Sequence, residues 1–467
     1  MPRSSLTRPL MTSRRRPAFL PQTEGLEGRQ LLTSPGTLDS TFGLGGSTLA
    51  GSGYGRQVEI QRINGQDLLL VAGDNANDIR ITRLLPSGAI DTSFGVSGSA
   101  TLDFAGKEDF VRDLVVLPDG RFIVAGDANT SFQVGTQGGN PVYSTTQDFA
   151  VAVYRANGSL DTSFSGDGKA TFNISTNTTN QFSYRNDRLN AAEVLDDGSI
   201  LLAGSSANPD GQRDASIIKV STSGNLDPTF GNAGVVEYRL PGYESTAVWD
   251  LAVLHGTTAS PDDDRIMVLE TPSNNSVNYW AIGLARFTPS GQLDATYGAN
   301  GGRTLTAATA SLPAWKMAAR QDGSVIVTGR IDYANAVSST SDGFLASYTA
   351  TGLPDTNFGT RGLATFDVNG TDTGYAVVID PGPTASAADD KIYVAGNCGG
   401  GGFVARFAAN TGLLDATFGT GGVVLQQGVS QDLAIQSDGK VVTITTRSTT
   451  TKRGATNEFL VYRYNGN

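Results

Sequence analysis

The sequence predicts an all-β protein, a seven-bladed β-propeller of four-stranded antiparallel blades. A phrase close to Gly-x-Leu-Asp-x-Thr-Phe-Gly recurs seven times in the 467 residues, and repetition at such a period is typical of arrays whose units bury apolar surface against their neighbours. Apolar runs separated by Asp-Gly turns, together with 58 glycines, favour short strands over helices. The aromatic of the phrase stands at Phe42, Phe94, Phe164, Phe230, Tyr297, Phe358 and Phe418.

The second unit shows the expected strands most clearly. Residues 113–120 form an apolar run that ends in Asp-Gly, and residues 121–126 form a second run, so the pair predicts a hairpin. Residues 148–155 alternate larger and smaller apolar side chains, which indicates a strand buried on both faces. Residues 169–174 supply the fourth strand. Residues 127–147 are interpreted as a polar insertion between the second and third strands.

The two ends of the repeat region predict a closed ring. Residues 36–50 contain the repeat phrase and one following strand, whereas residues 458–466 contain only a third strand and its turn. We therefore expect the N-terminal strand to complete the last blade, which removes open sheet edges. The propeller domain is predicted to span residues 36–467, preceded by a leader at residues 1–35.

These repeats resemble those of the bacterial delta-60 repeat proteins, which carry the same Leu-Asp-x-Thr-Phe-Gly phrase and Asp-Gly hairpin. The resemblance covers residues 36–467 and implies a propeller-like fold on an exported bacterial protein. It supplies no catalytic residues. The order of strands and turns also resembles NHL-type propellers, more weakly.

The leader is basic and lacks the repeat pattern. Residues 1–35 carry six Arg against two Glu, and the apolar centre of an ordinary secretory signal is missing. The Leu-Glu-Gly-Arg-Gln-Leu-Leu segment at residues 26–32 resembles a leader found on large bacterial envelope and secreted proteins. We therefore expect an extracellular or envelope location. The alternative is that residues 1–35 form a disordered tail that carries no export signal.

Charge and composition exclude several partners. The net charge is −11, and an acidic body repels nucleic acid and anionic lipid. No stretch approaches the roughly 20 apolar residues that span a bilayer, so no membrane span is expected. The single cysteine, Cys398, excludes an intramolecular disulfide and is interpreted as incidental. We expect a monomer.

An aspartate recurs in every repeat phrase. We predict that it caps the turn by accepting hydrogen bonds from nearby backbone N–H groups, because Asp is favoured in such turns. Six units also place a cation near the end of the third strand, which predicts an ion pair across each turn; the fifth unit lacks it. The aspartates are Asp39, Asp91, Asp161, Asp227, Asp294, Asp355 and Asp415, and the cations are Arg83, Arg155, Lys219, Arg286, Arg406 and Arg463.

Loop length varies almost entirely on one face. The connections between the second and third strands, and between blades, share that face and differ in length, whereas the Asp-Gly turns share the other. Function concentrates on loops held by a rigid scaffold, so the variable face is the candidate ligand site. Tyr143, Tyr184 and Tyr333 are its candidate stacking groups.

The sequence contains few residues that could support catalysis or bind a metal. A single histidine, His255, excludes a site that needs two. The acidic loops at residues 258–264 and 384–390 lack the alternating Asp pattern of calcium loops, so we expect no cofactor, with calcium as the alternative. Carboxylates alone can perform acid–base chemistry, and Glu59 and Glu193 stand in first strands that should line the axis.

The sequence thus predicts a non-catalytic extracellular or envelope binding module whose variable loops hold a polysaccharide or a surface protein. A purely structural surface or adhesion component is one alternative. A carboxylate-dependent glycan hydrolase or lyase is the other.

Overall fold

The computed structural model describes most of the chain beyond the leader. The described residues are 34–466 except 76–77, 105, 138–139, 176–185, 209, 211, 257, 259–260, 275–278, 299–301, 306–309, 321, 334–340, 383, 385–388 and 452–453. Met1–Thr33 is a separate unit outside the described residues, and Ser34–Asn467 is one compact unit.

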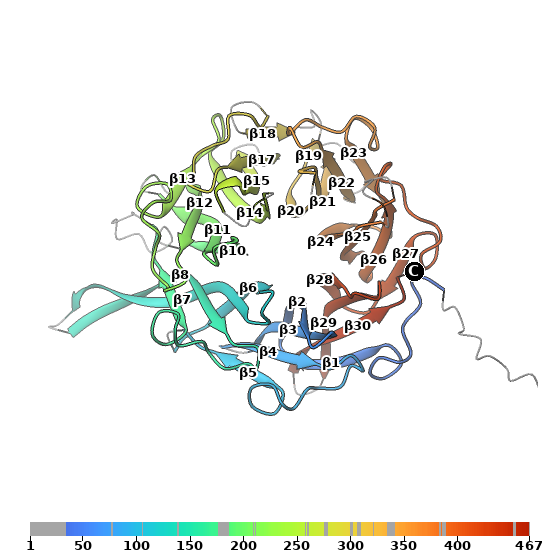
Figure 1. Cartoon of the computed structure of the whole chain (residues 1–467), viewed down its shortest axis with the longest axis horizontal. Helices are drawn as coiled ribbons and strands as arrows, with labels where there is room; N and C mark the ends of the chain where they lie inside the picture. Colours follow the sequence, from blue (N-terminus) through green and yellow to red (C-terminus); the bar gives the residue numbers. More distant parts are fainter. Residues whose placement is uncertain are drawn as a thin grey trace, which may run out of the picture. The chain divides into compact units, whose positions relative to one another are not determined.

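Seven antiparallel sheets stand around a ring, which confirms the predicted seven-bladed propeller (Figure 1). The first strand of each blade contacts the first strands of the blades before and after it, so these seven strands are innermost. Within the described residues the only helical element is a 3₁₀ turn, Pro261–Asp263. Accordingly, no described helix has the length and apolarity needed to cross a bilayer.

The blades follow one another along the chain, each with its strands in order from the centre outward. Blade one holds β2 (Tyr54–Ile63), β3 (Gln66–Asn75), β4 (Asp78–Leu84) and β5 (Ser99–Leu102); blade two holds β6 (Asp109–Val116), β7 (Phe122–Gln137), β8 (Asn140–Tyr154) and β9 (Lys169–Phe172); blade three holds β10 (Arg188–Val194), β11 (Ile200–Ala207), β12 (Arg213–Val220) and β13 (Val235–Tyr238).

Blades four and five each contain a fifth strand. Blade four holds β14 (Ser245–Leu254), β15 (Arg265–Asn274), β16 (Tyr279–Trp280), β17 (Ile282–Phe287) and β18 (Gly302–Leu305). Blade five holds β19 (Ala310–Ser311), β20 (Ala314–Ala319), β21 (Val325–Tyr333), β22 (Asp342–Tyr348) and β23 (Leu363–Phe366). Blade six again has four strands: β24 (Thr373–Asp380), β25 (Lys391–Cys398), β26 (Gly401–Ala408) and β27 (Val423–Gln426).

Blade seven joins the two ends of the propeller. It holds β28 (Val429–Ile435), β29 (Val441–Thr451), β30 (Gly454–Tyr464) and, from the N-terminal side, β1 (Ser47–Ser52). Strand β1 pairs antiparallel with β30, with Ser47 opposite Tyr462. The predicted closure by the N-terminal strand is therefore confirmed.

The core consists of apolar layers between adjacent blades. Each of the seven hydrophobic clusters draws its residues from two neighbouring blades; Leu70 and Ile81 of blade one, for example, share a cluster with Leu114 and Phe122 of blade two. Each blade therefore depends on its neighbours for burial, as in other repeat arrays.

The insertion at residues 127–147 differs from expectation. Instead of a loop, most of it extends β7 and β8 into a long two-stranded ribbon that projects from the ring at the left of Figure 1. Backbone pairing continues from Phe122↔Tyr154 to Gln137↔Asn140 with one bulge. Polar composition suggested a loop here, but a ribbon needs no buried side chains once the ladder of backbone hydrogen bonds is extended.

The repeat phrase connects each blade to the next. Its aromatic is at most 3% exposed in every blade. The residue after the aromatic donates its N–H to the outer hairpin turn of the following blade, as from Gly95 to Asn157 O at 2.9 Å and, at the ring closure, from Gly419 to Pro35 O at 3.0 Å. Gly95 has φ +52°, and a Cβ there would lie 2.2 Å from Ser99 O, so both conformation and space favour glycine. Blade two holds Ser165 at the same position, with φ +52°.

Candidate functional site

The turn face is occupied by the repeated ion pairs. Asp91 accepts hydrogen bonds from the backbone N–H and the hydroxyl of Ser93, and Arg83 donates to its second oxygen at 2.8 Å. Burial works to raise the pKa of Asp91, but these hydrogen bonds and the Arg83 charge hold it below its usual value. Asp355 accepts from the Asn357 N–H at 3.1 Å and has Ser347 at the position of the cation.

The same arrangement recurs around the ring. The six pairs have nitrogen–oxygen distances of 2.8–3.5 Å and are Asp39–Arg463, Asp91–Arg83, Asp161–Arg155, Asp227–Lys219, Asp294–Arg286 and Asp415–Arg406. In several blades the guanidinium also lies over the buried aromatic, as for Arg83 at 4.7 Å from the Phe94 centroid. These carboxylates are engaged in holding the scaffold.

The variable face carries a cavity of about 500 Å³ between blades four and five, which we call the aromatic pocket. Three tryptophans and two arginines contribute to its wall. The lining residues are Arg213, Ser245, Ala247, Trp249, Thr271, Ser273, Trp280, Pro313, Ala314, Trp315 and Arg330.

Two of these tryptophans occupy the same position in neighbouring blades. Every inner strand has a β-bulge, and Trp249, Trp315 and Tyr375 are the bulged residues of blades four, five and six. A bulge re-aims the extra side chain. The rings form an edge-to-face series, with centroids 6.4 Å apart for Trp249–Trp315 and 5.8 Å for Trp315–Tyr375. Trp249 and Trp315 are only partly buried.

The third tryptophan comes from the short strand β16. Backbone pairing of Trp280 with Ser273 places Trp280 beside the end of β15, and the backbone N–H of Trp280 donates to Ser311 Oγ at 3.0 Å. This bond ties blade four to blade five at the pocket. Trp280 is also partly buried.

Two arginines supply positive charge at the pocket. Arg213 donates through Nη1 to Asn186 O and to Ser205 Oγ, both at 3.1 Å, and burial lowers the pKa of its guanidinium. Arg330 pairs with Asp332 at 2.7 Å and lies 5.9 Å from the Trp315 centroid.

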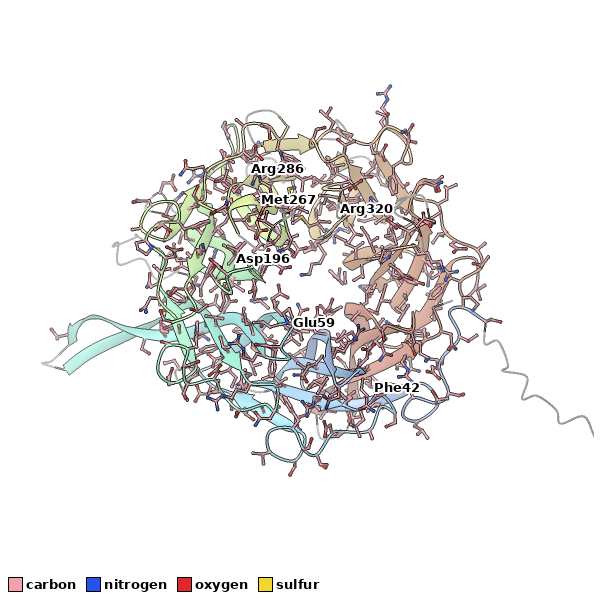
Figure 2. The ribbon with its side chains drawn as sticks, in the orientation of Figure 1. Phe42, Glu59, Asp196, Met267, Arg286 and Arg320 are labelled. Carbon is pink, nitrogen blue, oxygen red and sulfur yellow. The ribbon has the colours of Figure 1, made fainter. Side chains whose placement is uncertain are left out.

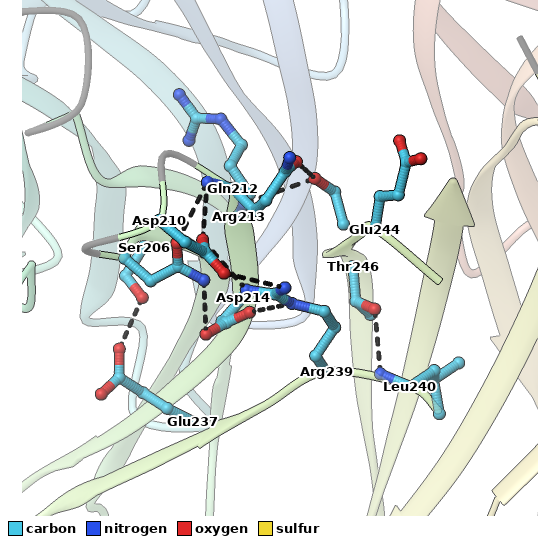
Figure 3. A network of polar contacts seen from close by, with 12 residues as sticks. Ser206, Asp210, Gln212, Arg213, Asp214, Glu237, Arg239, Leu240, Glu244 and Thr246 are labelled. Carbon is cyan, nitrogen blue, oxygen red and sulfur yellow. Dashed lines mark hydrogen bonds and ion pairs between the residues drawn. The ribbon is translucent and has the colours of Figure 1, made fainter. Parts of the chain in front are cut away.

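A polar network beside the pocket fixes the segment that carries Arg213 (Figure 3). Ser245 Oγ donates to Gln212 Oε1 at 2.9 Å, which joins blades three and four. Arg239 bridges Asp214 at 2.7 Å and Asp210 at 3.3 Å. The wall is thus held in place by hydrogen bonds within the protein.

The tyrosines predicted for the ligand face are not in this pocket. Tyr333 lies at the end of β21, is 42% exposed, and donates its hydroxyl to Asp342 Oδ2 at 3.2 Å. Tyr143 belongs to β8, but its side chain lies outside the described residues, as does all of Tyr184. The tryptophans were not predicted as a site, although Trp249 and Trp315 are 66 residues apart, about one repeat.

A second group of polar residues lies on the innermost strands. This inner-strand cluster consists of Glu59, Asp113, Glu193, Asp250, Lys316 and Asp432. Figure 2 shows Glu59 at the inner side of blade one, in contrast to Phe42 nearer the outside. The predicted placement of Glu59 and Glu193 on first strands agrees with β2 and β10.

Three aspartates of the cluster join adjacent blades. Asp113, Asp250 and Asp432 each accept a hydrogen bond, at 2.8–3.0 Å, from a backbone N–H on the inner strand of the next blade. Lys316 pairs with Asp250 at 2.9 Å. Although burial works to lower it, the surrounding carboxylates raise the pKa of Lys316.

The two glutamates have strongly shifted pKa values. Burial, reinforced by the charges of Asp432 and Asp113, raises the pKa of Glu59 to about 8. Burial and the charges of Asp113 and Asp250 raise the pKa of Glu193 to about 8. Both side chains are therefore mainly protonated at neutral pH and could act as general acids. Glu59 also lines a cavity of about 670 Å³ toward the turn face.

Metal-capable residues meet at one place among the described residues, where Asp196, His255 and Asp264 lie together. The consecutive aspartates considered for calcium have other contacts: Asp263 accepts from Thr258, Asp389 accepts from the Thr384 N–H, and Asp390 pairs with Arg320.

The seven-bladed architecture and the recurring sequence phrase together define a β-propeller protein built from repeats. A family model described as "Domain of unknown function (DUF5122) beta-propeller" matches residues 69–94, 138–164 and 195–230. This match supports a propeller repeat family, while the delta-60 name remains a resemblance. A search of curated proteins finds no match to this sequence.

Two solved structures illustrate a distant likeness to known propellers. The polysaccharide lyase Uly1 is 11% identical to this chain, with a TM-score of 0.47. The matched region covers 88% of this chain and 90% of the Uly1 chain. An alpha-l-arabinofuranosidase from Fusarium graminearum is 13% identical to this chain, with a TM-score of 0.40. The matched region covers 76% of this chain and 93% of the arabinofuranosidase chain. Likeness at this level concerns the propeller fold and carries nothing about activity.

Proposed function

We propose that this protein is an exported, non-catalytic module that binds a polysaccharide in the aromatic pocket. The observation that carries the proposal is the group of three partly exposed tryptophans, Trp249, Trp280 and Trp315, around a cavity of about 500 Å³ that also contains Arg213 and Arg330. Export is part of the proposal and rests on the leader resemblance at residues 26–32.

Partly exposed tryptophans on a rigid wall suit a sugar ring. Binding sites combine apolar and aromatic surface with a few placed polar groups. A sugar offers an apolar face that can lie on an aromatic ring, and hydroxyls that can exchange hydrogen bonds with polar groups of the wall. Tryptophan, being large and apolar, gains from being covered.

The arginines favour a sugar that carries negative charge. A guanidinium recognises carboxylates and related anions with paired hydrogen bonds, and such bonds are stronger than neutral ones. Arg330 already pairs with Asp332, so the expectation rests on Arg213, whose guanidinium donates to the neutral acceptors Asn186 O and Ser205 Oγ. We therefore expect uronic-acid polysaccharides to bind more tightly than neutral ones of the same length.

Binding to a panel of soluble acidic and neutral polysaccharides, measured by calorimetry, tests the proposal. Trp249→Ala and Trp315→Ala should each weaken binding at least tenfold, whereas Tyr54→Ala should leave it unchanged. Tyr54 is a matched control, since it is a half-exposed aromatic at the start of the inner strand of blade one. If no polysaccharide binds, or if the tryptophan variants bind like the parent, the pocket is not the site.

A glycan-active enzyme is the second candidate, favoured by the raised pKa values of Glu59 and Glu193. A general acid must hold its proton at the working pH, which both glutamates do. Depolymerisation of the same panel, followed by reducing-end release and by absorbance of unsaturated products, distinguishes the two. Turnover that Glu59→Gln or Glu193→Gln abolishes would establish the enzyme.

A further inference from the structure

Three side chains with metal-binding atoms meet where blades three and four join on the turn face. Asp196 belongs to the turn between β10 and β11, while His255 and Asp264 flank the loop between β14 and β15. Each offers one ligand atom, and these atoms lie within 4.8 Å of one another. We propose that Asp196, His255 and Asp264 form a binding site for a divalent transition-metal ion such as Zn²⁺.

The spacing of the three groups is close to that of a tetrahedral metal. His255 Nδ1 lies 2.9 Å from Asp196 Oδ1 and 3.8 Å from Asp264 Oδ1. Zinc bonds to nitrogen and oxygen of about 2.0–2.1 Å put tetrahedral ligand atoms about 3.3 Å apart. The two distances bracket that value, and the third separation, between the Asp196 and Asp264 carboxylates, is no more than 4.8 Å.

Asp264 gives an independent indication of a missing partner. Its side chain is fully buried, and among the described residues nothing donates a hydrogen bond to its Oδ2. The other oxygen, Oδ1, accepts a hydrogen bond from the Gly256 N–H at 2.9 Å, the one such bond that it receives from the described part of the chain. A buried carboxylate normally needs a pairing charge or a metal, because its removal from water is costly.

Blade six contains the same loop with the charge satisfied. There, Gly382 N–H donates to Asp390 Oδ1 at 3.1 Å, just as Gly256 N–H donates to Asp264. The buried Asp390, however, pairs with Arg320 of the preceding blade at 2.9 Å.

Among the described residues, no arginine pairs with the Asp264 carboxylate as Arg320 does with Asp390. Arg265 Nη1 donates at 2.7 Å to the backbone O of Asp264, and the same guanidinium pairs with Asp294. The hairpin turn of blade three holds Leu195 at the position that Arg320 takes in blade five, as the matching turn hydrogen bonds show. His255 correspondingly stands where blade six has Pro381. A cation at this joint in blade four would therefore replace the charge that Arg320 supplies in blade six.

The chemical types of the three ligand side chains indicate which class of metal ion the site would bind. One imidazole with two carboxylates suits zinc and neighbouring divalent transition metals, whereas calcium and magnesium prefer oxygen ligands alone. Half of the His255 side chain is exposed, so an ion can enter from solvent. Three protein ligands leave a fourth position for water. This inference departs from the sequence-based expectation of no metal and is independent of polysaccharide binding, which concerns the opposite face.

Zinc binding to the EDTA-treated full chain, measured by calorimetry at pH 7.5, tests the inference. We expect one saturable site, and a rise in Tm of about 3 °C at a free zinc concentration near 100 times Kd. His255→Asn should abolish both effects. Asp263→Asn, which changes the neighbouring carboxylate of the same loop, should preserve them.

Absence of saturable zinc binding would overturn the inference. So would binding that survives His255→Asn unchanged. Calcium binding that depends on Asp263 but not on His255 would assign the acidic loop a different ion and overturn it as well.

Discussion

Replacing Asp91 by alanine should destabilise the propeller more than the equivalent change in blade five. In the parent, the Arg83 guanidinium is buried against Asp91, with side-chain exposures of 8% and 12%. Removing one partner of a buried pair costs about 3–5 kcal/mol, because it leaves an uncompensated charge. Arg83 keeps hydrogen bonds to Gln61 Oε1 and Ala156 O, so we expect the lower end, about 3 kcal/mol.

Asp355→Ala is the matched control. Asp355 holds the same place in the repeat phrase but has no cation beside it, so the change removes chiefly the hydrogen bond from the Asn357 N–H. A hydrogen bond contributes about 1 kcal/mol net. With an unfolding entropy of about 2.1 cal/mol/K per residue, a cooperative unit of this size loses roughly 1 °C in Tm per kcal/mol.

Scanning calorimetry at pH 7 should therefore show Tm lowered by about 3 °C for Asp91→Ala and about 1 °C for Asp355→Ala. The pKa of Asp91 is lowered in the folded state, so its stabilisation is present above its unfolded pKa and is lost as pH falls through the folded value. The gap between parent and Asp91→Ala should thus close in strong acid. Equal shifts for the two variants at pH 7 would refute the ion-pair argument.

Three further predictions concern other parts of the molecule. Gly95→Ala should lower Tm more than Asp355→Ala, measured in the same scans, because the new Cβ would clash with Ser99 O. Shortening the β7–β8 ribbon by deleting residues 131–144 should leave Tm and polysaccharide binding within error, since the ribbon projects away from the ring; loss of binding would place the ligand there. Glu59→Gln should reduce the dependence of Tm on pH: the raised pKa of Glu59 means that its stabilising contribution is complete below its unfolded value near 4.5 and is lost as pH rises through about 8. The variant keeps Glu193, whose pKa is also raised to about 8, so both proteins should weaken across that range, the parent by more.

The fold was predictable because its determinants are local and repeated. The buried aromatic, the glycine after it and the aspartate three residues before the aromatic lie in one eight-residue phrase, and each has a single structural reason. The ring closure was predictable from the incomplete units at the two ends. The β7–β8 ribbon was not, because its polar residues resemble a loop and its strands are held by backbone pairing alone.

The candidate sites were less accessible to sequence reasoning. The aromatic pocket depends on β-bulges that turn Trp249 and Trp315 to one side, and a bulge has no distinct sequence signature. Their spacing of 66 residues was the available signal. His255 and Asp196 are 59 positions apart, and only the blade-to-blade contact brings them together. Glu59 and Glu193 were located correctly, but their raised pKa values depend on neighbours from other blades.

Several departures from the repeat lie together in blades three to five. A scaffold of similar blades offers similar surfaces all round, so a specific ligand must be recognised where the blades differ. Blades three to five contain the three tryptophans, the inner-strand Lys316 and the Asp196–His255 pair. The ion-paired turns, by contrast, repeat one arrangement in six of the seven blades. If recognition follows this asymmetry, substitutions at bulged positions should matter in blades four and five and not in blade one. Arg56→Ala, at the bulge of β2, should accordingly leave ligand binding unchanged while Trp315→Ala removes it.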